Sequence, residues 1–188
     1  MARVLVPLAD GCEELEAVTI IDLLRRAQIE VVTAGLKPGA VKASRGTVLV
    51  PDTTIDQIHS NEFDMVVLPG GMPGAQHLAE DSRVLDLLKS MAEAGKYTCA
   101  ICAAPVALAK AGLLSGKRAT SFPGFLDGLE LPDVTYTESP VEKDGKIITS
   151  RGPGTAMDFA LELIAELEGP DTRRIVEERL MRPSAAAR

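Results

Sequence analysis

The sequence predicts one α/β domain with a mostly parallel sheet and helices on both faces. One observation is that nearly continuous apolar runs, as in a strand covered on both faces, alternate with segments of helical period. Another is that strand, helix and strand follow one another within about 35 residues at the start, a pattern typical of a right-handed parallel crossover. We therefore assign residues 1–188 to a single domain and expect 183–188 to be a frayed tail.

The N-terminal elements follow from apolar spacing. Residues 3–8 read as a strand that Gly11 breaks, and 29–34 read as the next strand. Between them we expect a helix over about 13–27, because apolar residues recur at close to helical spacing, at Leu15, Val18, Ile21, Leu24 and Ala27.

The middle of the chain alternates in the same way. Residues 41–50 read as two short strands with a turn near Arg45-Gly46, and 63–68 as a buried strand followed by a tight loop at 69–74. Further elements are expected as a helix over 82–94, a strand over 97–101 and a helix over 103–113.

The last third begins with an irregular segment, 119–133, that is rich in Gly and Pro. Asp144-Gly145 in the middle of 141–148 is a hairpin signature. A helix is expected over 156–168, and Pro170 should start a last short helix.

Composition narrows the function classes. The net charge is −7, and only 3% of residues are aromatic, so repulsion from phosphates and the lack of stacking side chains make nucleic-acid binding unlikely. No apolar stretch approaches the ~18 residues of a membrane span. The three cysteines are an odd set without metal-type clustering, which favours reduced thiols in the cytoplasm and no metal site.

Three loops follow predicted strands, at 9–14, 69–74 and 102–105, and parallel sheets place ligand sites at the carboxyl ends of strands. Cys102 lies between an apolar strand and a small-residue helix, a junction that resembles a nucleophile elbow. Helix N-terminal N–H groups there would stabilise a thiolate. The alternative is that Cys102 is a buried structural cysteine.

The other two cysteines are expected to have no catalytic role. Cys99 and Cys102 spell C-x-x-C, but three extended residues separate their α-carbons by ~10 Å, beyond the ~7 Å limit for a disulfide. We therefore reject a redox dithiol and place Cys99 in the core. Cys12 is expected in an exposed loop, as a loop residue rather than a second oxidisable thiol.

Candidate partners of Cys102 are mostly acidic. Neither His59 nor His77 neighbours it in sequence, whereas Glu13, Glu14 and Glu16 open the first helix. They either complement the helix dipole, or one of them, at a pKa raised by burial, exchanges a proton with the thiol. The N–H groups of Gly70-Gly71 would stabilise an oxyanion, unless those glycines only form a tight turn. Arg45 and Arg151 would hold an anion, a dimer interface or an ordinary surface ion pair.

These motifs together resemble the ThiJ/PfpI superfamily, in the branch of the Parkinsonism-linked protein DJ-one and bacterial YajL. The resemblance covers about residues 3–168. It rests on four segments: Gly-Cys-Glu-Glu-Leu-Glu16, Leu-Pro-Gly-Gly71, Ala-Ile-Cys-Ala-Ala-Pro105, and Val-Glu-Lys-Asp-Gly145 through Thr-Ser-Arg-Gly-Pro-Gly154.

The resemblance implies a flavodoxin-like three-layer sandwich and a homodimer. It assigns Cys102 as the oxidisable nucleophile and Glu16 as the glutamate that contacts it. By the same resemblance, a small anion pocket is lined by Gly70, Gly71 and Ala103, with Arg45 and Pro153 near it and Arg45 close to the partner subunit.

Two positions help to decide which branch of the superfamily the sequence resembles. Ala103 rather than histidine follows Cys102, which argues against the protease-like branch. Phe122 stands where many members have a histidine, so a mechanism that depends on that histidine is in doubt.

The resemblance implies a cysteine-dependent enzyme without a cofactor that converts 2-oxoaldehydes such as methylglyoxal to hydroxy acids. It also implies removal of early glyoxal adducts from proteins and nucleotides. The alternative is a redox-sensing stress chaperone in which oxidation of Cys102 is the switch. Both roles use Cys102, so the sequence does not separate them.

Overall fold

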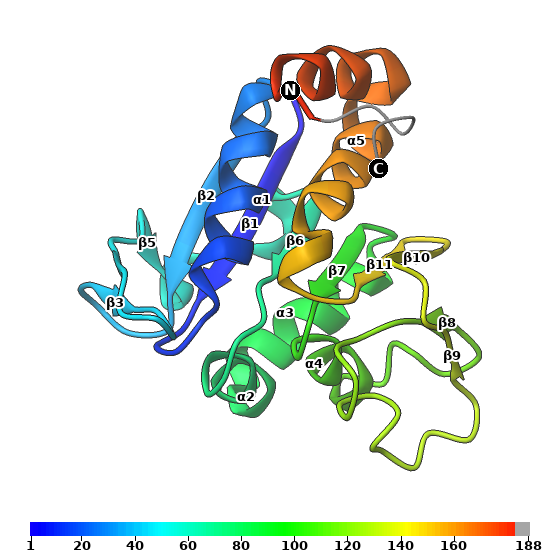
Figure 1. The fold of residues 1–188 in the computed structure, drawn as a ribbon. Coiled ribbons are helices and arrows are strands. Elements are labelled where there is room, and N and C mark those ends of the chain that lie inside the picture. Colours follow the sequence, from blue (N-terminus) through cyan, green and yellow to red (C-terminus); the bar gives the residue numbers. More distant parts are fainter. Residues whose placement is uncertain (183–188) are drawn as a thin grey trace.

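The computed structural model describes residues 1–182 and is built on a seven-stranded sheet of order β10-β11-β7-β6-β1-β2-β5. All neighbouring pairs are parallel except β10 and β11. Helices α1 and α5 pack together on one face, and α2, α3 and α4 cover the other (Figure 1). The predicted mostly parallel α/β sandwich is therefore confirmed. The expected tail at 183–188 lies outside the described residues.

The elements have the following bounds. The strands are β1 (Arg3–Leu8), β2 (Glu30–Gly35), β3 (Val41–Lys42), β4 (Val48–Leu49), β5 (Thr53–Thr54), β6 (Met65–Leu68), β7 (Tyr97–Ile101), β8 (Arg118–Ala119), β9 (Thr135–Tyr136), β10 (Val141–Asp144) and β11 (Ile147–Ser150). The helices are α1 (Glu14–Arg26), α2 (Gly74–Glu80), α3 (Ser82–Glu93), α4 (Pro105–Lys110) and α5 (Ala156–Arg179), with 3₁₀ turns at Ile55–Gln57, Ser60–Glu62 and Pro153–Thr155.

The central strands are apolar because both faces of the sheet are covered. Every residue of β6 is buried, and in β1 only Arg3 is not. Such runs lack the alternation of a half-exposed strand, which is why 3–8, 63–68 and 97–101 could be predicted from sequence. Burying these side chains between two helical layers supplies most of the driving force for the fold.

The C-terminal helix divides where the sequence predicts. Gly169 has φ +85° inside α5, so the helix is two segments joined at a kink, and Pro170 starts the second. In contrast, α4 is shorter than the predicted 103–113. It starts at Pro105 because Cys102 to Ala104 form the turn from β7, and Gly112, with φ +76°, follows its end. No helix in residues 1–182 is long and apolar enough to cross a membrane.

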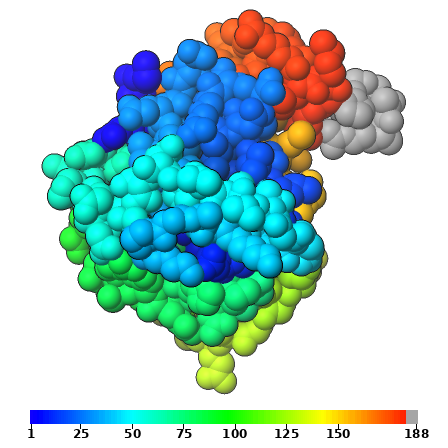
Figure 2. Space-filling model, turned by 90° about the vertical axis from the view of Figure 1, so that its left-hand side faces the viewer, coloured from blue at the N-terminus to red at the C-terminus, as the bar shows by residue number. Residues whose placement is uncertain are grey.

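A hairpin made of β3 and β4 extends from one side of the sheet. Figure 2 views this side, where the light-blue and cyan segment that contains the hairpin crosses between the darker blue α1 and the green segments below. Gly46, at φ +98°, makes the turn that the sequence predicts.

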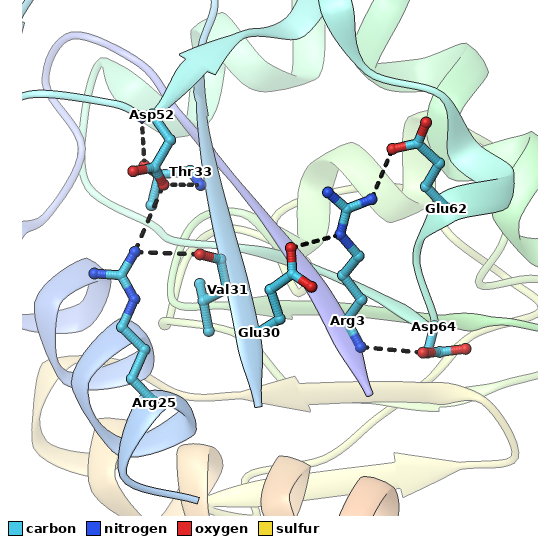
Figure 3. A network of polar contacts seen from close by, with 8 residues as sticks. All are labelled: Arg3, Arg25, Glu30, Val31, Thr33, Asp52, Glu62 and Asp64. Atoms are coloured by element: carbon cyan, nitrogen blue, oxygen red, sulfur yellow. Dashed lines mark hydrogen bonds and ion pairs between the residues drawn. The ribbon is translucent and has the colours of Figure 1, made fainter. Parts of the chain in front are cut away.

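A polar network runs along β1, β2 and the short edge strand β5 (Figure 3). The Arg3 guanidinium donates to Glu30 at 2.9 Å and to Glu62 at 2.7 Å. Asp52 accepts from the Thr33 hydroxyl at 2.7 Å, and this contact holds the chain beside the short edge strand β5. Because these charges lie at the rim and are partly exposed, the network adds little stability.

Candidate functional site

Three loops meet at one edge of the sheet because β1, β6 and β7 are neighbours and all end there. The loop after β1 lies directly on the loop after β6, and Glu13 N donates to Gly70 O at 2.9 Å. A β-carbon on Gly71, whose φ is +86°, would lie 2.3 Å from Glu13 N. Gly71 is therefore required by both conformation and space.

Cys102 forms a strained elbow between β7 and α4. Its φ is +63°, a conformation that L side chains rarely adopt. Two main-chain hydrogen bonds hold it there, from Cys102 N to Ser150 O at 2.9 Å and from Phe122 N to Cys102 O at 2.8 Å. The side chain is 8% exposed, so the sulfur stands at the surface of the core with restricted access to solvent.

Glu16 is fully buried beside this cysteine. Its Oε2 accepts from Gly70 N at 2.8 Å, and its Oε1 is buried without a hydrogen-bond partner in residues 1–182. Burial raises the pKa of Glu16 to about 7, although the Gly70 N–H and the Cys102 thiol act in the opposite direction. At neutral pH this carboxyl group therefore exchanges its proton readily.

The electrostatics of Cys102 differ from the sequence-based expectation of a stabilised thiolate. Burial and the negative charge of the neighbouring Glu16 raise the pKa of the thiol, whereas the N–H groups of Gly71 and Ala103 lower it. The expectation is wrong as long as Glu16 is ionised. When Glu16 takes up a proton its charge disappears, and the pKa of the thiol falls, but burial of the sulfur still opposes the thiolate.

The three neighbouring glutamates have different surroundings. Glu13 is the N-cap of α1 and accepts from Glu16 N at 2.8 Å. Glu14 faces the hairpin and accepts from Arg45 N at 3.0 Å, from Ser44 Oγ at 3.1 Å and from Thr47 N at 3.3 Å. These donors outweigh desolvation by burial and lower its pKa to about 2. Only Glu16 faces Cys102.

The other two cysteines are buried. Cys99 lies within β7, as expected, and burial raises its thiol pKa. The expectation that Cys12 is exposed is wrong, since its side chain is 0% exposed. Gly71 and Gly74 pack directly against its backbone, which closes the loop over it. Burial and the charges of Glu14 and Glu13 raise the pKa of Cys12 to about 11.

The remaining candidates lie at different distances from the elbow. Ala103 is buried next to Cys102, and Pro153 is half-buried in the 3₁₀ turn after β11. Arg45 is exposed at the hairpin turn, and its side chain forms no ion pair within residues 1–182. The expected place of Arg45 near the anion pocket and the partner subunit therefore stays a prediction.

Both histidines are away from the elbow. His59 is exposed, and His77 is exposed on α2 with its Nδ1 3.0 Å from Asp10 O. Arg151 is half-buried at the end of β11, 4.0 Å from Glu138. Within residues 1–182 no group of three or more His, Cys, Asp or Glu side chains is arranged to hold a metal ion.

Sequence reasoning missed the contribution of Ser150 to the site. Its carbonyl accepts from Cys102 N, and its Oγ lies 2.7 Å from Pro140 O and 2.7 Å from Thr155 Oγ1. The signal was present, because β11 pairs with β7 and its end must lie beside Cys102. The segment from Ser150 to Thr155 is therefore a fourth loop at the same edge.

Comparison with known proteins identifies the class. The model of the DJ-1/PfpI family matches residues 2–166, so the chain belongs to this family, as the sequence resemblance indicates. Protein dj-1beta of Drosophila melanogaster is 47% identical over 178 residues, which are 94% of this chain and 95% of the relative. Its crystal structure superposes with a TM-score of 0.92 at 46% identity and covers 97% of this chain and 98% of that chain.

Two other relatives carry more specific descriptions. The glutathione-independent glyoxalase DJR-1.2 of Caenorhabditis elegans is 35% identical over 170 residues, 90% of each chain. A structure of Toxoplasma gondii DJ-1, described as oxidized, is 39% identical with a TM-score of 0.90 and covers 96% of this chain and 98% of that chain.

Proposed function

We propose that the protein is a cysteine-dependent glyoxalase that hydrates 2-oxoaldehydes such as methylglyoxal to 2-hydroxy acids without a cofactor. The observation that carries the proposal is the pair of Cys102 and Glu16, in which the Gly70 N–H holds the Glu16 carboxyl group and the N–H groups of Gly71 and Ala103 act on the sulfur. A relative described as a glutathione-independent glyoxalase supports it.

The reaction starts when the Cys102 thiolate forms a C–S bond with the aldehyde carbon, and the resulting oxyanion takes up a proton. In the hemithioacetal, Glu16 removes the proton from the former aldehyde carbon, and the electron pair forms an enediolate. N–H groups near the sulfur stabilise its negative charge.

Glu16 then returns the proton to the neighbouring carbon, which leaves a 2-hydroxy thioester on Cys102. Water attacks the thioester carbonyl, the C–S bond breaks, and the hydroxy acid leaves with regeneration of the thiol. The overall change is addition of one water, so no oxidant or reductant is required. A carboxyl group with a pKa of about 7 suits both proton transfers.

The test is the production of lactate from methylglyoxal by the purified protein. Cys102→Ser and Glu16→Gln should each lower the rate at least about a hundredfold, as expected for the nucleophile and the proton carrier. Glu13→Gln is the matched control, because Glu13 caps the same helix without facing the sulfur. Unchanged turnover in Cys102→Ser would overturn the proposal. The second implied activity, release of adducts from glycated proteins, has to be assayed after free methylglyoxal has been removed, because consumption of free methylglyoxal would mimic it.

A redox sensor is the second candidate, since the same N–H groups could hold the oxygens of an oxidised sulfur and one relative is described as oxidized. Peroxide would convert Cys102 to a sulfenic and then a sulfinic acid, with one peroxide reduced to water at each step. Protection of a client protein from aggregation by the oxidised protein, in the absence of lactate production, would favour this role and a chaperone function.

We also propose a homodimer, on family resemblance and on the apolar surface beside the hairpin. Leu15, Val18, Val48 and Val50 are large apolar residues that are exposed on α1 and around β4. Val18 and Val50 line one hollow between α1 and the hairpin. Burying such a patch is favourable. Light scattering at micromolar concentration should give twice the chain mass of 19.9 kDa, and a value near that mass would contradict the proposal.

A further inference from the structure

A groove of about 140 Å³ lies between α2 and α4, next to Cys102. Its lining is mostly apolar: Met72, Ala75, Ala79, Ala103, Val106 and Phe125. Gln76 and Lys110 add polar groups. A ligand pocket has this composition, a mainly apolar lining with few polar side chains.

The groove and the candidate site share Ala103, and other groove residues are next to site residues in the chain. Gly71 and Ala103 are the residues whose N–H groups act on the Cys102 sulfur. Met72, the next residue after Gly71, and Ala103 itself both line the groove. The groove therefore begins at the residue that follows Cys102, and it is the nearest cavity into which the arm of a molecule bound at the sulfur would extend.

An aromatic pair lies at the same place. Phe125 lines the groove, and its ring meets that of Phe122 edge to face, with 6.3 Å between the centroids. Phe122 is bonded through its N–H to the carbonyl of Cys102, and its ring is 45% exposed. An exposed phenylalanine beside a reactive thiol provides a surface on which an apolar or aromatic group can pack.

We propose that this groove binds the apolar arm of the substrate, so that the site takes 2-oxoaldehydes with an aryl or longer alkyl group in preference to methylglyoxal. An apolar cavity of about 150 Å³ is known to hold benzene, so a groove of about 140 Å³ matches a phenyl ring in size. The inference rests on the proposed function for its substrate class, but the groove itself can be tested without turnover.

The first test is alkylation of Cys102 by iodoacetamide and by N-benzyl iodoacetamide, followed by mass spectrometry. In each reaction the thiolate forms a C–S bond and iodide leaves, so the reagents differ only in the arm. Relative to the same ratio for glutathione, the benzyl reagent should be favoured about tenfold, equivalent to about 1.4 kcal/mol. No preference over glutathione would overturn the inference.

Two variants fill the groove. Val106 is half-buried and Gln76 is exposed, so Val106→Phe and Gln76→Phe add bulk without replacing a core side chain. Each should lower the benzyl preference at least about fivefold and leave the iodoacetamide rate within about twofold. Lys89→Phe on α3, an exposed position outside the groove, is the control and should keep the preference. A preference unchanged by both filled variants would place the benzyl group elsewhere and refute the proposal.

The second test compares kcat/KM for phenylglyoxal and methylglyoxal. Phenylglyoxal should be preferred about tenfold, and Val106→Phe should abolish that preference without lowering methylglyoxal turnover. Turnover of methylglyoxal with no aryl preference contradicts the groove but not the glyoxalase. An aryl preference in alkylation without turnover of either aldehyde contradicts the glyoxalase and leaves the groove as an apolar subsite of another thiol reaction.

Discussion

Replacing Glu16 with glutamine should make Cys102 more reactive while it stops turnover. The amide can still accept from Gly70 N through its oxygen, so the cradle around the side chain is kept. The change removes the negative charge that, together with burial, raises the pKa of Cys102.

The size of the effect follows from that contact. A neighbouring charge shifts a pKa by roughly one to three units, so removal of the Glu16 charge should lower the thiol pKa by about one to two units. A less basic thiolate is also a weaker nucleophile, with a Brønsted coefficient of about 0.4–0.5. Alkylation at about pH 8 should therefore accelerate roughly three- to fifteenfold.

The assay is the rate of Cys102 alkylation by limiting iodoacetamide, with ultraviolet absorbance of the thiolate followed against pH. Glu13→Gln should change both quantities far less than Glu16→Gln, because Glu13 bonds to the main chain of α1 and its charge is the smallest of the influences on Glu16. Glu16→Asp, which retracts the carboxylate by one methylene, should give an intermediate rate. Equal or slower alkylation of Glu16→Gln would show that the charge of Glu16 does not suppress the thiolate and would refute the reasoning.

The remaining predictions concern the stability of two variants and the order in which the three cysteines are oxidised. Because the pKa of Glu16 is raised from 4.5 to about 7 in the folded protein, the free energy of unfolding of the wild type falls as pH rises through that window. The free energy of unfolding of Glu16→Gln should therefore exceed that of the wild type by up to about 3 kcal/mol at about pH 8 and by nothing at about pH 4. Urea unfolding at both pH values checks this, and an equal gain at both would contradict it. Gly71→Ala should lower the free energy of unfolding by at least about 2 kcal/mol in the same assay, because the φ of Gly71 is +86° and the new methyl group would meet Glu13 N. A loss of less than about 0.5 kcal/mol would contradict this close packing. Peptide mapping after limiting peroxide should find Cys102 modified before Cys12 and Cys99, which are both fully buried, and the reverse order would count against the site.

The sequence predicts the long elements because each has a clear apolar pattern. Continuous apolar runs mark β1, β6 and β7, and apolar residues at close to helical spacing mark α1. The strands β5, β8 and β9 were missed, since two residues are too few to show a period and their pairing is decided by distant partners.

The sequence predicts where the site lies, but it predicts the surroundings and pKa values of the site residues only in part. Loop positions follow from strand ends, so the meeting of Gly70, Gly71 and Cys102 could be expected. The direction of each glutamate depends on how α1 packs, and the 1–2 residue spacings of Glu13, Glu14 and Glu16 place them on different sides of a helix. The burial of Cys12 depends on glycines far along the chain that pack onto it, and no local pattern encodes that contact.

Backbone strain provides an independent argument for the proposal that Cys102 is the reactive residue of the site. Among residues 1–182, three residues other than glycine have positive φ: Gln28, Cys102 and Met181. Gln28 and Met181 each follow the C-cap of a helix, where a left-handed residue is the ordinary way for a helix to end. Cys102 has no such reason, because it lies between a strand and a helix and is held in place by bonds to Ser150 and Phe122. Glycine would fit this conformation with less strain, so a cysteine maintained there by its surroundings is best explained by what its sulfur does.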